Sequence, residues 1–269
     1  MKRDKSQVSK AQKVGSAKYT LLSFATIAIF LLVWWALVRV RGSNVPTPYR
    51  VLQAFVGKLT QKGPDGATLG VNILTSLQVS LTGLVLAAGI GIPLGVLMGW
   101  YKLFERFVKV IFEIVRPIPP ISWIPLTILW FGVGLKAKAV IIFISAFVPC
   151  VINSYTGIRQ VNPTLIDVAK TFGAKDFYIF THVGLPSAVP MIFAGLRVSL
   201  SNAWATLVAA EMLAASAGLG NMINMARNFG RMDVVMVGMI CIGAFGALFS
   251  WLFGILESAI LKGRAFTNG

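Results

Sequence analysis

Five ionisable residues lie inside long apolar runs of this 269-residue chain: Glu113, Arg116, Arg197, Glu211 and Glu257. A charge in such surroundings is costly, so each of these residues is a candidate for handling an ion or a polar solute. Glu113 and Arg116 are three residues apart and could instead form a structural ion pair on one helical face. Arg197 would suit a small anion, but backbone carbonyls could equally hold it, and Glu211 could be a gate or a salt-bridge partner.

The residue types needed for catalysis or metal binding are not spaced for either purpose. The chain contains no nucleophile–base pair or carboxylate pair placed as catalysis would require. Cys150 and Cys241 both lie in apolar runs, and His182 is the only histidine, so neither a disulfide framework nor a metal site is indicated. A Walker-type phosphate loop is also absent from the sequence. We predict no catalytic residue, no metal site and no cofactor held by this chain.

The composition assigns the chain to the integral membrane proteins. Hydrophobic residues make up 56% of it and charged residues 13%, against about 25% charged in a typical soluble domain. The formal net charge is +16, and six of the cations precede the first apolar run: Lys2, Arg3, Lys5, Lys10, Lys13 and Lys18. We attribute this basic tail to orientation in the membrane, with some attraction to anionic lipid, and not to nucleic-acid binding.

Six apolar segments predict an all-α polytopic protein with about six membrane spans. An even number of spans places both termini on one side, and the basic tail indicates that this side is the cytoplasm. We expect a tail over 1–18, a membrane domain over 19–262 and a second tail over 263–269. The expected spans are 19–39, 71–99, 104–130, 138–158, 188–213 and 234–258.

Three local patterns refine this plan. Gly91, Gly95 and Gly99 recur every four residues, which favours close approach of another helix. A short helix in the membrane interface is predicted by the apolar residues Leu52, Phe55, Val56 and Leu59, which lie opposite Arg50, Gln53 and Lys58.

Four prolines between 117 and 125 cannot continue an ordinary helix. Broken backbone at membrane depth occurs where it is buried in protein or lines a wet cavity, so this stretch indicates either a pathway or a kink in a buried helix.

The same reasoning yields candidates for the pathway itself. A face of the fifth span is rich in small and polar residues, which can line a pore or pack against a symmetry mate. The large rings of Trp123 and Trp204 could act as gates, although packing and interface anchoring are the ordinary roles of tryptophan. The candidate residues for the pathway are Arg116, Pro119, Trp123, Arg197, Asn202, Trp204 and Glu211.

The loop over 161–187 predicts two short helices on the cytoplasmic side. Asn162 can cap the first helix and Pro163 suits its first turn. Leu165, Val168, Ala169 and Phe172 form one apolar face, and Gly173 can end the helix in the left-handed conformation. We expect Asp176 to cap the second helix, and Gly184 with Pro186 to close it. The apolar face needs a cover, which could be the protein itself, lipid headgroups or a partner.

This loop resembles the EAA loop of ABC importer permeases. The residues that carry the resemblance are Asp167-Val168-Ala169-Lys170-Thr171-Phe172-Gly173, then nine residues, then Val183-Gly184-Leu185-Pro186. The departures from the family pattern are Asp167 for Glu, Val168 for Ala and Val183 for Ile. Further segments are similar to the nitrate, sulfonate, taurine and bicarbonate branch, among them Val45-Pro46-Thr47-Pro48, Arg116-Pro117-Ile118-Pro119 and Gly218-Leu219-Gly220.

The resemblance implies a type I ABC importer permease fold, with two copies of the chain in a bacterial inner membrane. Two separate ATPase subunits would bind ATP and magnesium, and an external binding protein would deliver the solute. The residues implied in docking to the ATPase are Asp167, Val168, Ala169, Phe172, Gly173, Leu185 and Pro186.

The solute itself stays open at this point. A small anion is expected, but permeases of this branch also serve vitamin precursors and aromatic acids. An ion-coupled secondary carrier and a membrane scaffold are the other possible functions. Such carriers commonly show internal repeats, and we find none in this chain.

Overall fold

The computed structural model describes residues 22, 25–40, 45–214 and 217–261, and every regular element within them is helical. The expected tails over 1–18 and 263–269, and the first residues of the expected span 19–39, lie outside the described residues. After an apolar helix at Ala25–Val40 come α2 (Pro48–Thr60), α3 (Leu69–Trp100), α4 (Lys102–Val115), the 3-10 helix η1 (Pro120–Trp123), α5 (Ile124–Phe131), α6 (Leu135–Arg159), α7 (Pro163–Thr171), α8 (Asp176–Ile179), the π-helix η2 (Phe180–Gly184), α9 (Leu185–Ala214), α10 (Leu219–Asn228) and α11 (Met232–Leu261).

Four of the expected spans are confirmed as long apolar helices. By length and composition, α3, α6, the continuous stretch Asp176–Leu213 and α11 can each cross a membrane. Their boundaries differ from the expected ones by a few residues, except at the start of α9, where helical structure continues back into the loop.

A fifth expected span needs correction. The segment 104–130 is not one helix, because α4 and the η1–α5 segment meet at an angle of 84°. The prolines cause this break, since each removes a backbone donor and its ring clashes with the preceding turn. If the bent pair counts as one span, the described residues contain five spans in all. The sixth expected span, 19–39, stays a prediction, because the structure describes Leu22 and the apolar helix Ala25–Val40 while residues 19–21, 23 and 24 lie outside the described part.

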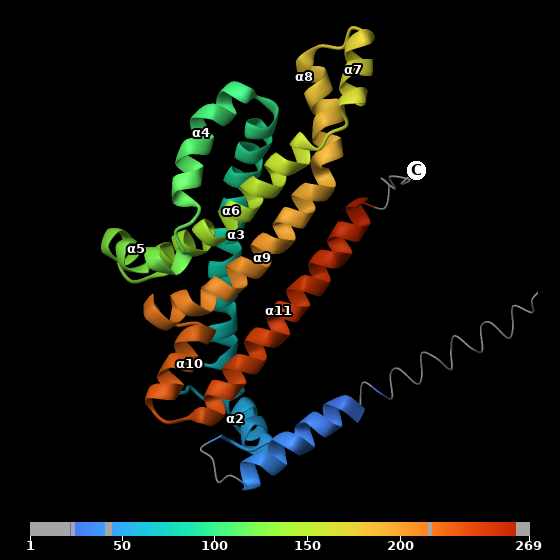
Figure 1. Ribbon diagram of the computed structural model, residues 1–269. Coiled ribbons are helices and arrows are strands. Elements are labelled where there is room, and N and C mark those ends of the chain that lie inside the picture. The colour runs from blue at the N-terminus through green and yellow to red at the C-terminus, as the bar shows by residue number, and fades with distance from the viewer. Residues whose placement is uncertain (1–21, 23–24, 41–44, 215–216, 262–269) are drawn as a thin grey trace, which may run out of the picture.

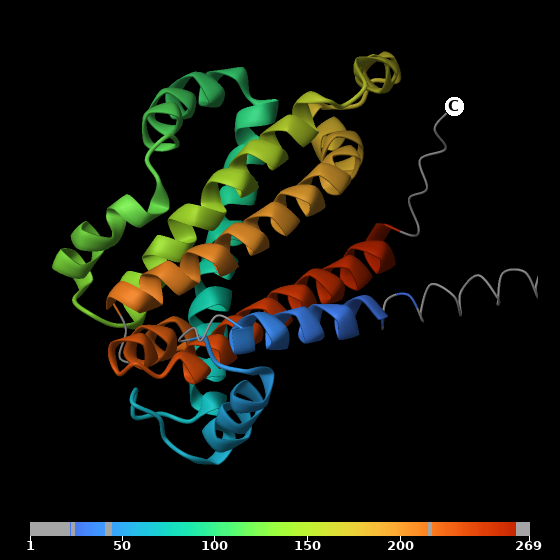
Figure 2. The same ribbon diagram turned by 60° about the horizontal axis from the view of Figure 1, so that its bottom comes forward.

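The centre of the molecule is a packed group of α3, α6 and α9, with α6 in contact with both neighbours (Figures 1 and 2). The expected close approach at the glycine row of α3 is confirmed. A Cβ atom on Gly95 would lie 2.4 Å from the backbone oxygen of Val151, and one on Gly91 would lie 2.9 Å from Cβ of Cys150. Only glycine permits this separation, so the row fixes where α3 crosses α6.

The small-residue face of α9 packs against α6 of the same chain. The Ser199 hydroxyl is fully buried and donates to the backbone oxygen of Ala146 at 2.7 Å. Part of the face that could have met a symmetry mate is therefore occupied within the chain, and α9 is held in a defined rotation about its axis.

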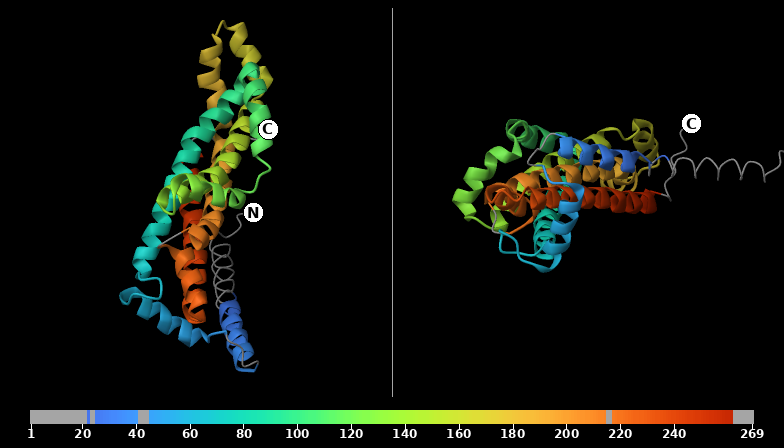
Figure 3. Two further views of the ribbon diagram at one scale, coloured as in Figure 1. Left: turned by 90° about the vertical axis from the view of Figure 1, so that its left-hand side faces the viewer. Right: turned by 90° about the horizontal axis from the view of Figure 1, so that it is seen from below.

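The molecule is long, with different structures at its two ends. The α7–α8 hairpin projects from one end, and α2 and α10 lie at the other (Figure 3). Between the ends, α4 contains no buried residue, and α11 exposes a series of large apolar side chains. That series is Met239, Ile240, Leu248, Trp251, Leu252, Ile255, Leu256 and Ile260.

The close contact at Gly95 predicts a stability effect. Gly95→Ala should lower the free energy of unfolding by about 1–3 kcal/mol, because the added methyl group overpacks the α3–α6 contact. The measurement is thermal unfolding of the purified protein in lipid nanodiscs. Gly89→Ala is the matched control on the same helix, since a Cβ there meets no atom within 4 Å. Equal melting temperatures for the two variants would contradict the close approach.

Candidate functional site

The hairpin of α7 and α8 begins as the sequence predicts. The Asn162 side chain accepts a hydrogen bond from the backbone nitrogen of Thr164 at 2.9 Å, and Pro163 is the first helical residue. Gly173 has φ +76°, the left-handed conformation expected at the other end. The backbone nitrogens of Gly173 and Ala174 donate to the backbone oxygens of Lys170 and Ala169, at 2.9 and 3.0 Å. This pair of bonds is a Schellman motif, so α7 is terminated firmly at both ends.

The expected apolar face of α7 is exposed. Phe172 is 86% accessible, and Leu165 and Val168 are about half accessible, while Asp167 is exposed and Ala169 half-buried. The described residues leave this face uncovered at the tip of the molecule (Figure 1). A rigid helix that presents a phenylalanine in this way has the form of a docking element.

The second helix of the hairpin differs from its expectation in two respects. Lys175 is its N-cap, and Asp176 lies in its first turn. The chain also does not stop at Gly184 and Pro186, because α8 continues through the π-turn η2 into α9. Leu185 and Pro186 are thus the first residues of α9, directly after the π-turn. The hairpin is continuous with a membrane-spanning helix.

Trp100, at the end of α3, holds the base of the hairpin. Its Nε1 donates to Asp176 Oδ2 at 3.2 Å, and its ring lies 5.3 Å from the ring of Phe180. Tyr101 contacts Phe180 as well, at 6.3 Å between ring centroids. The sequence analysis missed Trp100. The signal available was a tryptophan at a span end, which is ordinarily an interface anchor.

A cavity of about 300 Å³ lies where the α4–η1 break faces α6 and α9. It brings together two predicted pathway residues, Arg116 and Asn202, and adds Ser145 and Thr206. Ser145 Oγ lies 2.7 Å from Thr206 Oγ1 and 3.2 Å from the backbone oxygen of Asn202. The remaining lining residues are Val115, Ile118, Pro120, Ile144, Val148, Pro149 and Ala205. The cavity combines one cation with hydroxyl and amide groups in otherwise apolar walls.

Pro119 and Trp123 belong to the break and not to the cavity lining. Pro119 is exposed, and its backbone oxygen accepts from the backbone nitrogen of Ser122 at 2.9 Å, which starts η1. Trp123 Nε1 is buried and has no hydrogen-bond partner within the described part of the chain. The break is therefore a defined turn beside the cavity.

Two other pathway candidates lie between α9 and α11, outside the cavity lining. Arg197 forms an ion pair with Glu257. Trp204 is 7% exposed, and its Nε1 donates to the backbone oxygen of Ile242 at 3.0 Å. Both side chains connect α9 to α11, and their roles in a pathway stay predictions.

The expected pairing of Glu113 with Arg116 does not occur among the four ion pairs of the described residues. Glu113 and Arg116 are both exposed. Arg116 is therefore free of a carboxylate partner there, and its charge is available at the rim of the cavity.

Glu211 is fully buried and is a structural ligand for the start of α10. Both of its carboxylate oxygens accept from Ser76 Oγ, at 2.8 and 2.9 Å, and Oε2 also accepts from the backbone nitrogen of Gly220 at 2.9 Å. Ser76 Oγ in turn accepts from the backbone nitrogen of Leu219 at 2.9 Å. A buried carboxylate with these donors is satisfied. The arrangement ties α3, α9 and α10 together, and a role of Glu211 as a gate stays a prediction.

Several known proteins are similar to this chain in sequence. Residues 91–262 match the family described as the binding-protein-dependent transport system inner membrane component. A putative ABC transporter permease of Methanocaldococcus jannaschii is 38% identical over 237 residues, which cover 86% of this chain and 87% of that protein. The taurine transport system permease protein TauC of Escherichia coli is 35% identical over 238 residues, with 86% of each chain covered. The nitrate import permease protein NrtB of Synechocystis is 33% identical over 239 residues, with 87% of each covered.

A solved structure has the same fold. The chain of the inward-facing MetNI methionine ABC transporter superposes with a TM-score of 0.58 at 21% identity, covering 71% of this chain and 94% of that one. The resemblance found in the loop and the match to residues 91–262 agree with this architecture. The chain therefore belongs to the binding-protein-dependent transport system inner membrane components, the membrane-spanning permease subunits of ABC importers.

Proposed function

We propose that this chain forms the translocation path of an ATP-driven importer for a small anion of the sulfonate, taurine, nitrate or bicarbonate type. The single observation that carries the proposal is the α7–α8 hairpin, which is capped, exposes Phe172 and runs without interruption into α9. A part that receives force from a motor needs this combination of a rigid docking surface and a continuous connection to the membrane helices.

In this proposal two copies of the chain assemble in the inner membrane with two ATPase subunits. The ATPases bind ATP and magnesium, and the hairpin residues Asp167, Val168, Ala169, Phe172 and Gly173 dock in their grooves. The uncovered apolar surfaces of α4 and α11 support contact with lipid and with the second copy. The hairpin then faces the cytoplasm, with both termini on that side, and α2 faces outward.

The anionic cargo is supported by the cavity. Arg116 supplies a charge that carries no carboxylate partner among the described residues, and Ser145, Asn202 and Thr206 supply polar groups beside it. Charge-assisted hydrogen bonds suit a sulfonate, nitrate or bicarbonate oxygen. The relatives named for taurine and nitrate transport agree with this class. An external binding protein would make the first selection of the solute.

Docking through the hairpin predicts a specific loss on truncation. Phe172→Ala should weaken association with the ATPase subunit by at least about tenfold, because a central aromatic anchor is removed. Association can be measured by titrating the purified ATPase onto the permease in nanodiscs. Phe229→Ala is the matched control, since Phe229 is 67% exposed at the other end of the molecule. Normal ATPase binding by Phe172→Ala would contradict the docking role.

The contacts of Trp100 with Asp176 and Phe180 predict that truncating this side chain uncouples transport from ATP hydrolysis. Trp100→Ala should reduce transport per ATP hydrolysed by up to about thirtyfold, because the hairpin can then move without displacing α3. Trp100→Phe keeps a ring against Phe180 but loses the bond to Asp176, so it should fall between the wild type and Trp100→Ala. Uptake and hydrolysis are measured together in proteoliposomes. Trp130→Ala, at an exposed ring of α5, should leave the ratio unchanged. An unchanged ratio of transport to ATP hydrolysis in Trp100→Ala would show that the Trp100 contacts do not couple the hairpin to α3.

The cavity predicts a dependence of transport on Arg116. Arg116→Gln should raise the solute concentration for half-maximal uptake by about ten- to a hundredfold, since a charge-assisted bond is lost. Uptake of labelled taurine or nitrate by proteoliposomes is the measurement. Lys109→Gln is the control on the same helix, because its side chain is half exposed and makes only a loose pair with Glu105. Uptake by Arg116→Gln with unaltered concentration dependence would exclude Arg116 from the path.

A further inference from the structure

An open groove of about 700 Å³ lies at the end of the molecule opposite the hairpin. It runs between α2 with the loop that follows it and the turn from α10 to α11. In the proposed orientation this end faces outward. The groove is larger than the cavity beside Arg116 and separate from it in its lining residues.

Helix α2 has two different faces, and the groove lies along one of them. Tyr49, Leu52, Val56 and Leu59 are all more than half exposed. At about 100° per residue these side chains share one face, which suits the apolar side of the membrane interface. On roughly the opposite face are the groove residues Arg50, Gln53, Gly57, Lys58 and Gln61. The groove therefore faces away from the surface of α2 that suits lipid.

This division corrects the expected pattern of α2. Phe55 is half-buried and packs on the core, although it was expected on the interfacial face. Lys58 is buried, although it was expected on an exposed polar face. The polar side of α2 is therefore partly packed against the rest of the protein and is not simply exposed to solvent.

The groove has a net positive charge. Four cations and one acid line it: Arg50, Lys58, Lys62, Arg231 and Asp233. Lys58 is paired with Asp65, and Arg231 is paired with Asp233 at 2.9 Å. The hydrogen bonds to Asp233 raise the pKa of Arg231. Arg50 and Lys62 are exposed and have no ion-pair partner in the part of the chain that the structure describes, so they provide two uncompensated charges.

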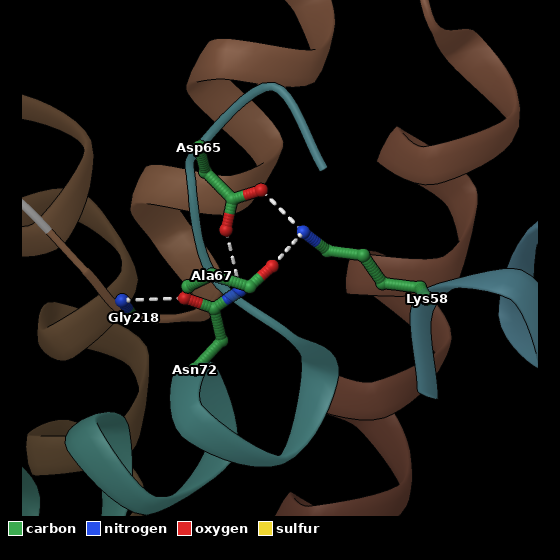
Figure 4. Close-up of polar contacts among 5 residues, drawn as sticks. All are labelled: Lys58, Asp65, Ala67, Asn72 and Gly218. Carbon is green, nitrogen blue, oxygen red and sulfur yellow. Dashed lines mark hydrogen bonds and ion pairs between the residues drawn. The ribbon is translucent and has the colours of Figure 1, made fainter. Parts of the chain in front are cut away.

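The wall of the groove is held by a buried polar chain (Figure 4). Lys58 Nζ donates to Asp65 and, at 2.6 Å, to the backbone oxygen of Ala67. Asp65 Oδ2 accepts from Asn72 Nδ2 at 2.6 Å, and Asn72 Oδ1 accepts from the backbone nitrogen of Gly218 at 3.0 Å. The chain fixes α2 to α3 and to the start of α10. A surface that is already ordered loses little conformational entropy when a partner binds.

We propose that this groove receives an acidic segment of the external binding protein, with Arg50 and Lys62 opposite its carboxylates. The inference rests on the proposed function, which supplies the partner. Charge complementarity identifies the chemistry of that partner. The position of the apolar face of α2 favours a protein over lipid headgroups, because lipid has its own face on the same helix.

The test uses charge reversal in the assembled transporter. The double variant Arg50→Glu with Lys62→Glu is reconstituted with its ATPase in nanodiscs of neutral phosphatidylcholine. The binding protein encoded with this permease is then titrated, and ATP hydrolysis is recorded. The binding-protein concentration for half-maximal stimulation should rise at least about tenfold, and it should lose most of its salt dependence. The rate at saturation should be preserved.

Two further measurements separate this proposal from simpler effects. Arg227→Glu is the matched control, because Arg227 is exposed on α10 and does not line the groove. It should leave the half-maximal concentration unchanged. A short oligoglutamate peptide should inhibit the stimulated hydrolysis of the wild type and not that of the double variant.

Three results would overturn the groove assignment. The first is a double variant whose half-maximal binding-protein concentration equals that of the wild type. The second is an equal rise of this concentration in Arg227→Glu. The third is a rise that appears only when anionic lipid replaces the neutral lipid. Failure of the proposed function looks different, because no ATPase would then associate with the wild-type chain. If the ATPase associates and is stimulated, the titration tests the groove alone.

Discussion

Backbone-close contact between α3 and α6 is the constraint on which the rest of the structure depends. Apolar helices in a bilayer gain little from leaving lipid for one another, so their arrangement has to come from tight packing and polar contacts. Gly95 allows the oxygen of Val151 to approach, and Ser199 on the other side of α6 bonds to Ala146. These contacts set α6 between its neighbours. The position of the cavity beside Arg116 follows from them.

Buried polar groups complete this arrangement at the end of the molecule that carries α2 and α10. Glu211, Ser76 and the first backbone nitrogens of α10 satisfy one another, and the Lys58–Asp65–Asn72 chain does the same for the loop after α2. An unpaired member of either group would be costly in surroundings without water. Each group is therefore complete only when its helices are in place. The end with α2 and α10 is fixed by this mutual dependence, whereas the base of the hairpin at the opposite end is fixed by aromatic contacts around Trp100.

The elements that the sequence predicted well are those that depend on neighbours in the chain. Span positions follow from runs of apolar residues, and the start and end of α7 follow from Asn162, Pro163 and Gly173, whose effects are local. The prolines after Arg116 predicted a break for the same reason, although not its angle of 84°.

The predictions of pathway residues depend on how helices are rotated against one another. Arg197 and Arg116 both lie in apolar stretches of the sequence, yet Arg197 pairs with Glu257 whereas Arg116 lines a cavity. Trp204 and Glu211 were candidates because of their type, and their partners Ile242 and Ser76 lie far away in the chain. The local sequence pattern does not show which residue of another helix will lie opposite each of these side chains. The family resemblance did identify the hairpin, since that motif is a continuous stretch of sequence.

The π-turn between α8 and α9 has a mechanical meaning. A turn of this kind holds one residue more than an α-helical turn, so the two helices form a single rod with an angular offset at Phe180–Gly184. Tightening the turn to ordinary α-helical geometry would twist α8 relative to α9 by about 100°, the angle of one residue. Because Ser199 and Trp204 hold α9 in place, a displacement at the hairpin tip would be taken up at this turn as rotation of α8.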